Sequence, residues 1–521
     1  VEVLSSPTPK RPALGKVINV LGNYMDKGLE TDSALYRHKI PVDFSAEALI
    51  ENEEISEKIE AKEKSKRVDL TQLKLVTIDG KDSRDFDDAV YAEKQHHGWK
   101  LIVAIADVSH YVKEGSELDK EAFERGNSVY FPQRVVPMLP EKLSNGLCSL
   151  NPKVERLCLT CEMKINKQGE LTSYKFYPAV MSSHARLTYE TAALILEKKD
   201  PKVRKNHAAI LENLSSLYTL YKALKKAKQK RGVMSFDRAE SQLLFNKKGK
   251  IHKIVAANRN EAHKLIEECM LMANQATARF LGENKEDFLY RIHPRPSADK
   301  VKSIRRFLQT LGLTLEGGLN PESKDFEDIL KKVEGRKDEN IIKTVILRTM
   351  MQATYTPEND GHFGLVLEDY THFTSPIRRY PDLLVHRAIK RVLSQKKRMP
   401  SKKMTEAGAH LSMTERRADD ASRDVEQWLK CEYMSKKLGE TFDGIISGVN
   451  GFGLYVELEG VFVEGFVSIA DLRGDYYTFD DTRYQLKGQR TNKIFKLGDS
   501  IRVKVAAVNL DERRMILIPI K

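Results

Sequence analysis

The amino-acid sequence predicts an α+β domain, with a mixed sheet and many helices, followed by a C-terminal all-β barrel of the OB-fold type. Three observations support this prediction. Segments rich in β-branched residues lie between residues 73 and 108, stretches with helical spacing of apolar residues fill much of residues 187–439, and short alternating strands separated by glycine follow Gly439. With 521 residues the chain exceeds one ordinary core, so roughly two to four domains are expected.

The composition is that of a globular protein with an excess of basic residues. Hydrophobic residues make up 41% of the chain and charged residues 31%, and no apolar run approaches the roughly 18 residues that a membrane-spanning helix needs. No secretory signal opens the chain. Lysine and arginine number 87 against 74 acidic residues, which gives a formal net charge of +13. This charge indicates either a polyanionic partner or a solvated basic surface, because charge alone does not separate the two.

The five cysteines are few and odd in number, which is typical of a reducing cytosol. Cys158 and Cys161 form a C-x-x-C motif, but no second pair follows at the spacing of a zinc site. We therefore interpret them as residues of a strand, of which one or both face the core.

The elements are predicted in order along the chain. Residues up to about 25 look like the last strands of a β domain, so the chain is expected to be a fragment, and residues 44–68 are expected to form a helix or a linker. Strands are predicted at residues 73–79, 89–94 and 99–108. Helices are predicted at residues 187–199, 207–232, 260–281, 297–313, 325–335, 378–395 and 412–439. The pattern after Gly439 predicts the small five-stranded barrel.

An acidic cluster lies between the first two of these strands. The segment TIDGKDSRDFDDAV, residues 77–90, contains the aspartates Asp79, Asp82, Asp85, Asp87 and Asp88. Their mutual repulsion is unfavourable, so a positive charge is expected among them. A calcium loop of the EF-hand type is excluded, because counting from Asp82 places Arg84, Phe86 and Asp87 where two ligands and a glycine are needed.

Two interpretations of the cluster remain open from the residues alone. One is a solvated acidic turn that pairs with Lys81 and Arg84. The other is a hard-cation site, because Mg²⁺ prefers oxygen ligands, and two ions about 4 Å apart activate water and stabilise the leaving oxygen of a phosphodiester. A basic chain that carries such a site and an OB-fold indicates hydrolysis of RNA or DNA.

Several segments together resemble a known family. TIDGKDSRDFDDAV and HFTSPIRRYPDLLVHR, residues 372–387, resemble the two signatures of the RNB family, the ribonuclease II and ribonuclease R exoribonucleases. The segments at residues 127–152, 259–274 and 361–376 agree, and details such as SVYFP are closest to the bacterial ribonuclease R branch. The resemblance covers essentially the whole chain. It implies a C-terminal remnant of a cold-shock OB-fold at residues 1–25, a linker at 26–66, an RNB-type catalytic domain at 67–437 and an S1-type RNA-binding OB-fold at 438–521.

The resemblance also assigns roles to residues. It implies that Asp79, Asp85, Asp87 and Asp88 hold the metal ions and that Asp87 is indispensable for cleavage. Arg378 matches a catalytic arginine, whose guanidinium suits a scissile phosphate. Arg379 is a further candidate for contact with RNA, and Tyr130 matches an aromatic residue that packs on the terminal nucleotide. In the barrel the expected RNA-binding residues are Phe452, Tyr455, Phe466, Arg502 and Lys504.

The activity that the resemblance implies is processive 3′→5′ hydrolysis of RNA to nucleoside 5′-monophosphates with Mg²⁺, two ions in the active complex, in RNA turnover and quality control. The implied partners are single-stranded RNA and RNA duplexes with a 3′ overhang, with ribosome or degradosome association in a bacterial cytoplasm, as a monomer and without a membrane. The fragment is expected to cleave RNA and to bind single strands less tightly than a chain with intact cold-shock domains. The alternatives are an RNA-binding adaptor without cleavage and an endonuclease or DNA-directed enzyme.

Overall fold

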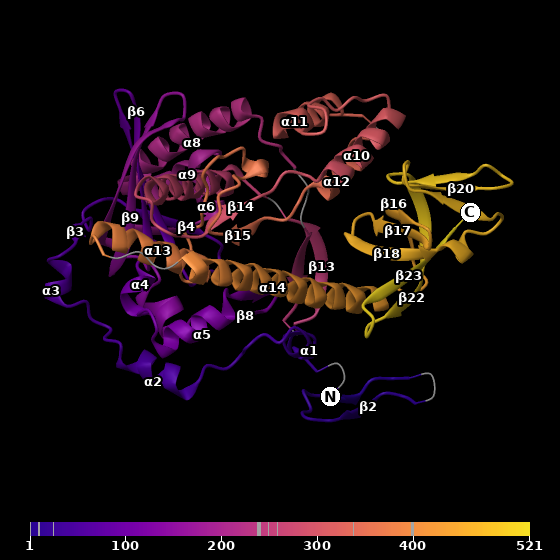
Figure 1. Ribbon diagram of the computed structural model, residues 1–521, viewed down its shortest axis with the longest axis horizontal. Helices are drawn as coiled ribbons and strands as arrows, with labels where there is room; N and C mark the ends of the chain where they lie inside the picture. Colours follow the sequence, from indigo (N-terminus) through magenta and orange to yellow (C-terminus); the bar gives the residue numbers. More distant parts are fainter. Residues whose placement is uncertain are drawn as a thin grey trace.

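The computed structural model describes residues 2–8, 11–23, 26–236, 241–247, 249–257, 259–336, 338–396 and 401–520. A central sheet with its helices lies at one end of an elongated molecule and a small barrel at the other, and the long helix α14 (Ser401–Ser435) runs between them (Figure 1). No helix among the described residues is long and apolar enough to cross a membrane.

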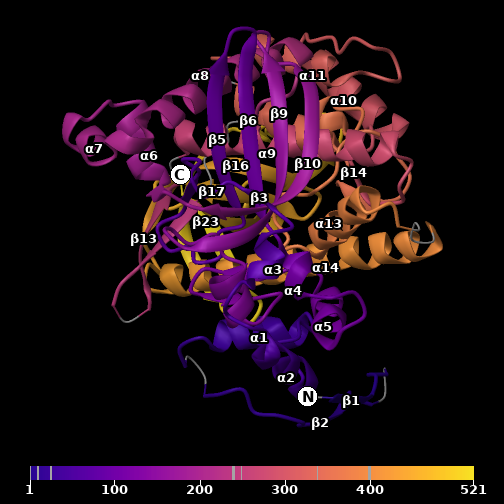
Figure 2. The same cartoon turned by 90° about the vertical axis from the view of Figure 1, so that its left-hand side faces the viewer.

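The central sheet has seven strands in the order β11-β4-β5-β6-β9-β10-β3, and β5, β6, β9 and β10 stand side by side in Figure 2. Its strands are β3 (Val68–Asp69), β4 (Val76–Asp79), β5 (Asp88–Gln95), β6 (Gly98–Ala106), β9 (Glu155–Asn166), β10 (Leu171–Ser182) and β11 (Ala185–Thr188). The edge strands β11 and β3 pair in parallel with their neighbours, whereas the five strands between them are antiparallel. We call these strands, with the helices packed on them, the sheet domain.

Both faces of the sheet are buried, as the alternation along β6 shows. Leu101, Val103 and Ile105 point into one apolar cluster, and Ile102 and Ala104 point into another. The first cluster is covered by α6 (Tyr189–Leu196), α8 (Leu211–Arg231) and α9 (Glu261–Glu283). The second is covered by α2 (Ala46–Glu54), α4 (Val108–Tyr111), α5 (Glu117–Arg125), the π-helix η1 (Lys142–Leu147) and the start of α14. Helix α13 (Tyr380–Leu393) contributes residues to both clusters.

The remaining elements surround this domain. The N-terminal elements are β1 (Glu2–Ser5), β2 (Leu14–Lys16), α1 (Leu29–Arg37) and α3 (Ala61–Lys64). The short strand pairs are β7 (Val129–Phe131) with β8 (Arg134–Val136), β12 (Ser241–Phe245) with β13 (Ile251–Ala256), and β14 (Tyr290–Ile292) with β15 (Thr354–Thr356). The other helices are α7 (Pro201–Asn206), η2 (Ala208–Ile210), α10 (Ala298–Thr310), α11 (Ser323–Lys332), α12 (Glu339–Thr349) and η3 (Phe363–Leu365).

The C-terminal part is a closed barrel of five strands in the order β16-β17-β18-β23-β22, which confirms the predicted all-β barrel. Its strands are β16 (Thr441–Asn450), β17 (Gly453–Leu458), β18 (Val463–Ser468), β22 (Ser500–Asn509) and β23 (Arg514–Pro519). Between β18 and β22 lie the short helix η4 (Ile469–Asp471) and a separate sheet of β19 (Tyr477–Asp480), β20 (Gln485–Gly488) and β21 (Ile494–Lys496).

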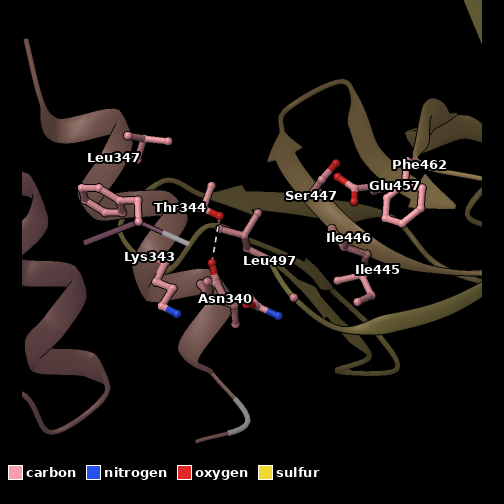
Figure 3. Close-up of a pocket in the computed structure, with 13 residues that line it drawn as sticks. Asn340, Lys343, Thr344, Leu347, Ile445, Ile446, Ser447, Glu457, Phe462 and Leu497 are labelled. Carbon is pink, nitrogen blue, oxygen red and sulfur yellow. Dashed lines mark hydrogen bonds between the residues drawn. The ribbon is translucent and has the colours of Figure 1, made fainter. Parts of the chain in front are cut away.

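The barrel contacts α12, one of the elements that surround the sheet domain. Gly498 has φ +87°, and a Cβ built on it would lie 2.2 Å from Cγ1 of Ile341, so only glycine permits this approach. Arg348 Nη2 donates a hydrogen bond to the carbonyl oxygen of Ser447 at 3.2 Å across the same seam. The seam contains a largely apolar pocket of about 250 Å³, lined by residues of α12 and of the barrel (Figure 3). These contacts hold the barrel against α12.

Several sequence predictions are confirmed and a few need correction. The predicted strands correspond to β4, β5 and β6, and Cys158 and Cys161 are both buried in β9. The helix predicted at residues 187–199 is wrong at its start, because residues 187 and 188 pair in parallel with β4 and the Thr188 side chain then caps α6. The helix predicted from residue 412 already runs from Ser401. Residues 44–68 hold α2 and α3, and the boundary predicted at residue 25 lies outside the described residues.

Candidate active site

The acidic cluster lies where β4 ends and β5 begins. Asp79 is the last residue of β4 and Asp88 the first of β5, and the two strands pair through Val76 and Val90. Phe86 is 2% exposed and points into the core. Because side chains alternate along an extended segment, its neighbours on either side, Asp85 and Asp87, face away from that core.

The loop that carries Asp85 is braced by side chains from other elements. Ser149 Oγ accepts a hydrogen bond from the Phe86 amide at 3.0 Å and donates one to the Arg84 carbonyl at 2.6 Å. Arg186 Nη2 donates to the carbonyls of Lys81 and Ser83, at 2.7 and 3.0 Å. The carboxylates are therefore held in place before any ligand binds. Asp82, which is not among the four aspartates predicted to hold metal ions, is exposed.

Asp87 joins the two sequence motifs. Its Oδ1 accepts a hydrogen bond from the Ile377 amide at 2.9 Å, and its Oδ2 lies 3.4 Å from Nε of Arg378. Arg378 is itself oriented by a 2.8 Å hydrogen bond from its Nη2 to Ser375 Oγ. Asp87 is 5% exposed, whereas the Arg378 side chain is 41% exposed. The arginine thus links a buried carboxylate to an open space.

The electrostatics of the cluster favour a bound cation. Burial and the neighbouring Asp85 carboxylate raise the pKa of Asp79 to about 6, although Arg378 and Arg186 oppose the rise. Burial and the charge of Asp79 raise the pKa of Asp88 to about 8. Burial also raises the pKa of Asp87 well above its usual range. The raised pKa values mean that ionising these carboxylates together is unfavourable, and a bound cation would offset that cost.

The cluster fits a magnesium site in its donor chemistry. Oδ2 of Asp79 and Oδ2 of Asp87 are buried and accept no hydrogen bond from the described residues, although buried carboxylate oxygens normally have partners. Within the described ranges no group of three or more acidic, histidine or cysteine side chains lies close enough to hold a metal ion by itself. Magnesium typically takes one or two carboxylates and completes its shell with water and substrate phosphate oxygens, so an incomplete protein shell is compatible with it.

Tyr130 lies beside Asp85, and its predicted packing on a nucleotide stays a prediction. Its hydroxyl donates a 2.6 Å hydrogen bond to Oδ2 of Asp85, while 43% of the residue remains exposed. Tyr130 and Arg378 line a hollow of about 180 Å³, together with Asn127, Tyr355 and Glu415. Asn127 lies in a segment that carries the family resemblance, but none of these three residues was predicted as a site residue.

Arg379 also lines this hollow, but most of its guanidinium is already engaged. Its Nε and Nη2 donate to Oδ2 and Oδ1 of Asp382 at 2.9 and 2.8 Å, and that carboxylate is fully buried. Asp382 also accepts from the amide of Ser375 at 2.7 Å. The contact of Arg379 with RNA stays a prediction. Ser375 and Asp382 were missed, although Asp382 is the only acid of the basic segment SPIRRYPD.

The barrel residues fall into two groups. Phe452 is 79% exposed and Tyr455 40% exposed, and Tyr455 stands 5.2 Å, between ring centroids, from the half-buried Phe466. Arg502 and Lys504 are exposed on β22 but pair with the opposite end of β16. Arg502 is opposite Asp443 and Tyr455 opposite Gly448, so the aromatic and basic groups lie about 16 Å apart along β16. Their contact with RNA stays a prediction.

Comparisons with known proteins agree with this architecture. Residues 67–395 match the family model described as RNB domain, residues 435–518 match S1 RNA binding domain, and residues 1–45 match Cold shock domain. Ribonuclease R of Escherichia coli (strain K12) is 48% identical over 99% of the chain. The chain spans 65% of the length of that relative.

Two solved structures of Mycoplasma genitalium RNase R are similar in fold. The complex with ribose methylated single-stranded RNA has a TM-score of 0.89 at 30% identity, covering 98% of this chain and 80% of the other. The complex with double-stranded RNA has a TM-score of 0.83 at 29% identity, covering 98% and 85%. The RNB domain model matches well over half of the residues of this chain, and the chain therefore belongs to the RNB family.

Proposed function

We propose that the chain is a magnesium-dependent exoribonuclease that degrades RNA from its 3′ end to nucleoside 5′-monophosphates. The observation that carries this proposal is that Arg378, paired with Asp87, and Tyr130, bonded to Asp85, line one hollow beside the acidic cluster. Family membership and the E. coli relative's description as ribonuclease R support it.

The residues divide the chemistry among them. Magnesium, two ions in the active complex, would be held by Asp79, Asp85, Asp87 and Asp88, and when bound it supplies Lewis-acid stabilisation and an activated water. The exposed part of the Arg378 guanidinium faces the place of the scissile phosphate, where a fixed cation stabilises charge that develops in the transition state. Tyr130 stacks on the terminal base, and stacking of this kind tolerates any sequence.

The proposed substrates are single-stranded RNA and RNA duplexes with a 3′ overhang, including structured RNA. The fold shared with the Mycoplasma enzyme, whose structures contain single-stranded and double-stranded RNA, supports this choice. We propose that the exposed aromatics of the barrel, Phe452 foremost, receive bases upstream of the active site, with Arg502 and Lys504 further along the same barrel exterior.

The test is a time course with 5′-labelled single-stranded RNA and Mg²⁺, comparing the parent with Asp87→Asn. An asparagine keeps an oxygen for the Ile377 amide but removes a charged ligand, so the variant should fold and bind RNA. We expect its cleavage rate to fall by at least about a hundredfold. Asp82→Asn is the matched control, because it removes the same charge from an exposed position of the same loop and should change the rate by no more than about twofold.

The products separate the alternatives. A ladder that collapses to a short 5′-labelled end product supports 3′→5′ exonuclease action, whereas scattered internal fragments would indicate an endonuclease. Degradation of a DNA strand of the same sequence at an equal rate would contradict a preference for RNA. If the parent and Asp87→Asn both bind RNA without shortening it, the chain acts as an adaptor and the proposal is wrong.

A further inference from the structure

A second hollow, of about 520 Å³, lies outside the candidate active site. Three elements build it: the turn between β9 and β10, the second half of α8, and α9. Figure 1 shows α8 and α9 side by side over the sheet. The cations that line the hollow are Lys167, Lys226, Lys230, Arg231 and Arg279.

The hollow is remote from the carboxylates. Asp88 is opposite Ile105 on β6, and Ile105 is opposite Leu159 on β9. The turn that forms the hollow begins after Asn166, seven residues further along β9, which corresponds to about 23 Å of strand. A ligand in this hollow therefore does not touch the metal-binding residues.

The lining cations have no carboxylate partner in the described part of the chain, whereas their neighbours on α8 do. Lys225 pairs with Glu261 at 3.5 Å and Lys228 with Glu268 at 2.7 Å. None of the five lining cations forms an ion pair with a described residue within 4.0 Å. The acidic residue in the lining, Glu170, accepts a hydrogen bond from Asn166 Nδ2 at 2.9 Å. Among the described residues, the hollow thus gathers five cations without an ion-pair partner within 4.0 Å, beside one carboxylate, Glu170, while Glu268 acts on Arg231 from a greater distance.

The walls of the hollow are fixed in the folded chain. Gly169 has φ +83°, and a Cβ on it would lie 2.7 Å from the carbonyl oxygen of Ala223, so the turn sits directly on α8. Asn166 Oδ1 accepts hydrogen bonds from the amides of Gln168 and Glu170, at 3.0 and 2.9 Å, which holds the turn. A preformed concave site with a few convergent polar groups is the usual form of a ligand pocket.

The positions of the lining cations distinguish a ligand site from a helix C-terminus that is basic only because of its dipole. Lys230 and Arg231 belong to the last turn of α8, where cations are favoured by the helix dipole without any ligand. The dipole of α8 does not account for Lys167, which lies in the turn between β9 and β10, or for Arg279, which lies on α9. Three separate elements therefore direct cations into one hollow.

We propose that this hollow binds phosphate groups and that RNA is their source, at a point on the sheet domain distant from the cleavage site. The inference rests on the proposed function, because it takes RNA as the ligand of the chain. A free nucleotide carries the same phosphate chemistry and is the other possible source. An RNA bound at both places would have to be longer than one that reaches the active site alone.

The test compares a variant of the hollow with a matched control. Lys226→Gln, Lys230→Gln and Arg279→Gln are combined, because each removes a lining charge and spares the core. The control combines Lys198→Gln, Lys202→Gln and Lys205→Gln, which removes three exposed lysines that lie on and beside α7. Both are made in the Asp87→Asn chain, so that binding is measured without cleavage, and also in the active chain.

Binding is measured against salt with an RNA of about 10 nucleotides, which fills a single site, and one of about 30. For the longer RNA, we expect the slope of log affinity against log salt to fall by about 2 in the variant, since each lost phosphate contact on a single strand contributes about 0.7. Affinity for that RNA should fall about tenfold or more at physiological salt. The short RNA and the control should show no change.

The outcomes distinguish the sources and the two proposals. If the RNA slopes do not change but a nucleoside 5′-monophosphate or inorganic phosphate raises the melting temperature of the parent and not of the variant, free phosphate compounds are the ligand. If neither response differs between variant and control, the hollow binds no phosphate and the inference is wrong. If the parent chain does not cleave RNA, the proposed function is wrong instead. The binding comparison between the variant and the control can still be interpreted in that case.

Discussion

Replacing Arg378 with alanine should mainly impair RNA cleavage, whereas replacing its neighbour Arg379 with alanine should mainly destabilise the fold. Arg378 has a 41% exposed side chain and lies 3.4 Å from the buried Asp87, so the arginine side of this ion pair is open to solvent. Arg379 is 20% exposed and makes two short hydrogen bonds to Asp382, which is fully buried. Arg378 is therefore expected to act on the substrate, and Arg379 is expected to stabilise the fold.

The magnitudes follow from burial. Arg378→Ala removes one partner of a buried carboxylate, but Asp87 keeps its hydrogen bond from the Ile377 amide, so the melting temperature should fall less than in Arg379→Ala. Arg378→Ala should lower the cleavage rate about 100- to 1000-fold, the usual loss when one transition-state donor is removed. Arg379→Ala strands the Asp382 carboxylate in the interior, which typically destabilises a protein by about 3–5 kcal/mol. For a domain of this size that corresponds to a melting temperature lower by roughly 5–10 °C.

Two assays on each variant separate these effects: thermal unfolding followed by circular dichroism, and single-turnover cleavage of 5′-labelled RNA well below the melting temperature. Arg379→Lys is the control for the paired hydrogen bonds to Asp382, because lysine keeps the charge but not the bidentate geometry. Its melting temperature should lie between those of the parent and of Arg379→Ala. The reasoning is refuted if Arg379→Ala melts like the parent and yet loses cleavage as Arg378→Ala does.

Three further predictions concern stability, the barrel and the product. Asp107 is fully buried and lies 2.5 Å from Lys390. Burial alone would raise the pKa of Asp107, but the charges of Lys390 and Arg67 hold it well below its usual range. Its stabilisation is thus present at neutral pH and lost as the pH falls below about 4, and Asp107→Asn should lower the free energy of unfolding by about 3–5 kcal/mol in urea titrations at pH 7, a difference that shrinks in acid. Gly498→Ala must displace Ile341 and strain its backbone by roughly 1–2 kcal/mol, so limited proteolysis should cut the connection between α14 and β16 faster than in the parent; an equal rate would contradict the tight seam. Tyr130→Ala should change the length of the final product on a denaturing gel through the loss of about 1–3 kcal/mol of stacking, and Tyr130→Phe should preserve that length.

Much of the fold could be predicted because its signals are local. The β-branched segments that became β4, β5 and β6 are short, apolar and bounded by turn residues, and the predicted helices have clear apolar spacing. Strand β10 was missed, because it contains Pro178 and its exposed and buried residues alternate irregularly. The sheet of β19, β20 and β21 was missed as well, since it is an addition to the five strands that the barrel pattern predicts.

The candidate site could be predicted in its charged residues but not in its supports. Asp79, Asp85, Asp87 and Asp88 are visible as a cluster in the sequence. The amide of Ile377 has no sequence signature, because every residue except proline carries the same donor. The engagement of Arg379 by Asp382 is likewise a matter of rotamers and burial, which a motif does not encode.

The hydrogen bond from Ile377 to Asp87 joins residues 290 positions apart. A ribosome that adds about 5–20 residues per second needs roughly 15–60 s to make the intervening chain. During that interval the acidic loop exists, but Arg378 and the amide that orients Asp87 do not. In the proposed exoribonuclease, the acidic loop is thus made before the residues that complete the site, and no complete site exists until residue 378 has been synthesised.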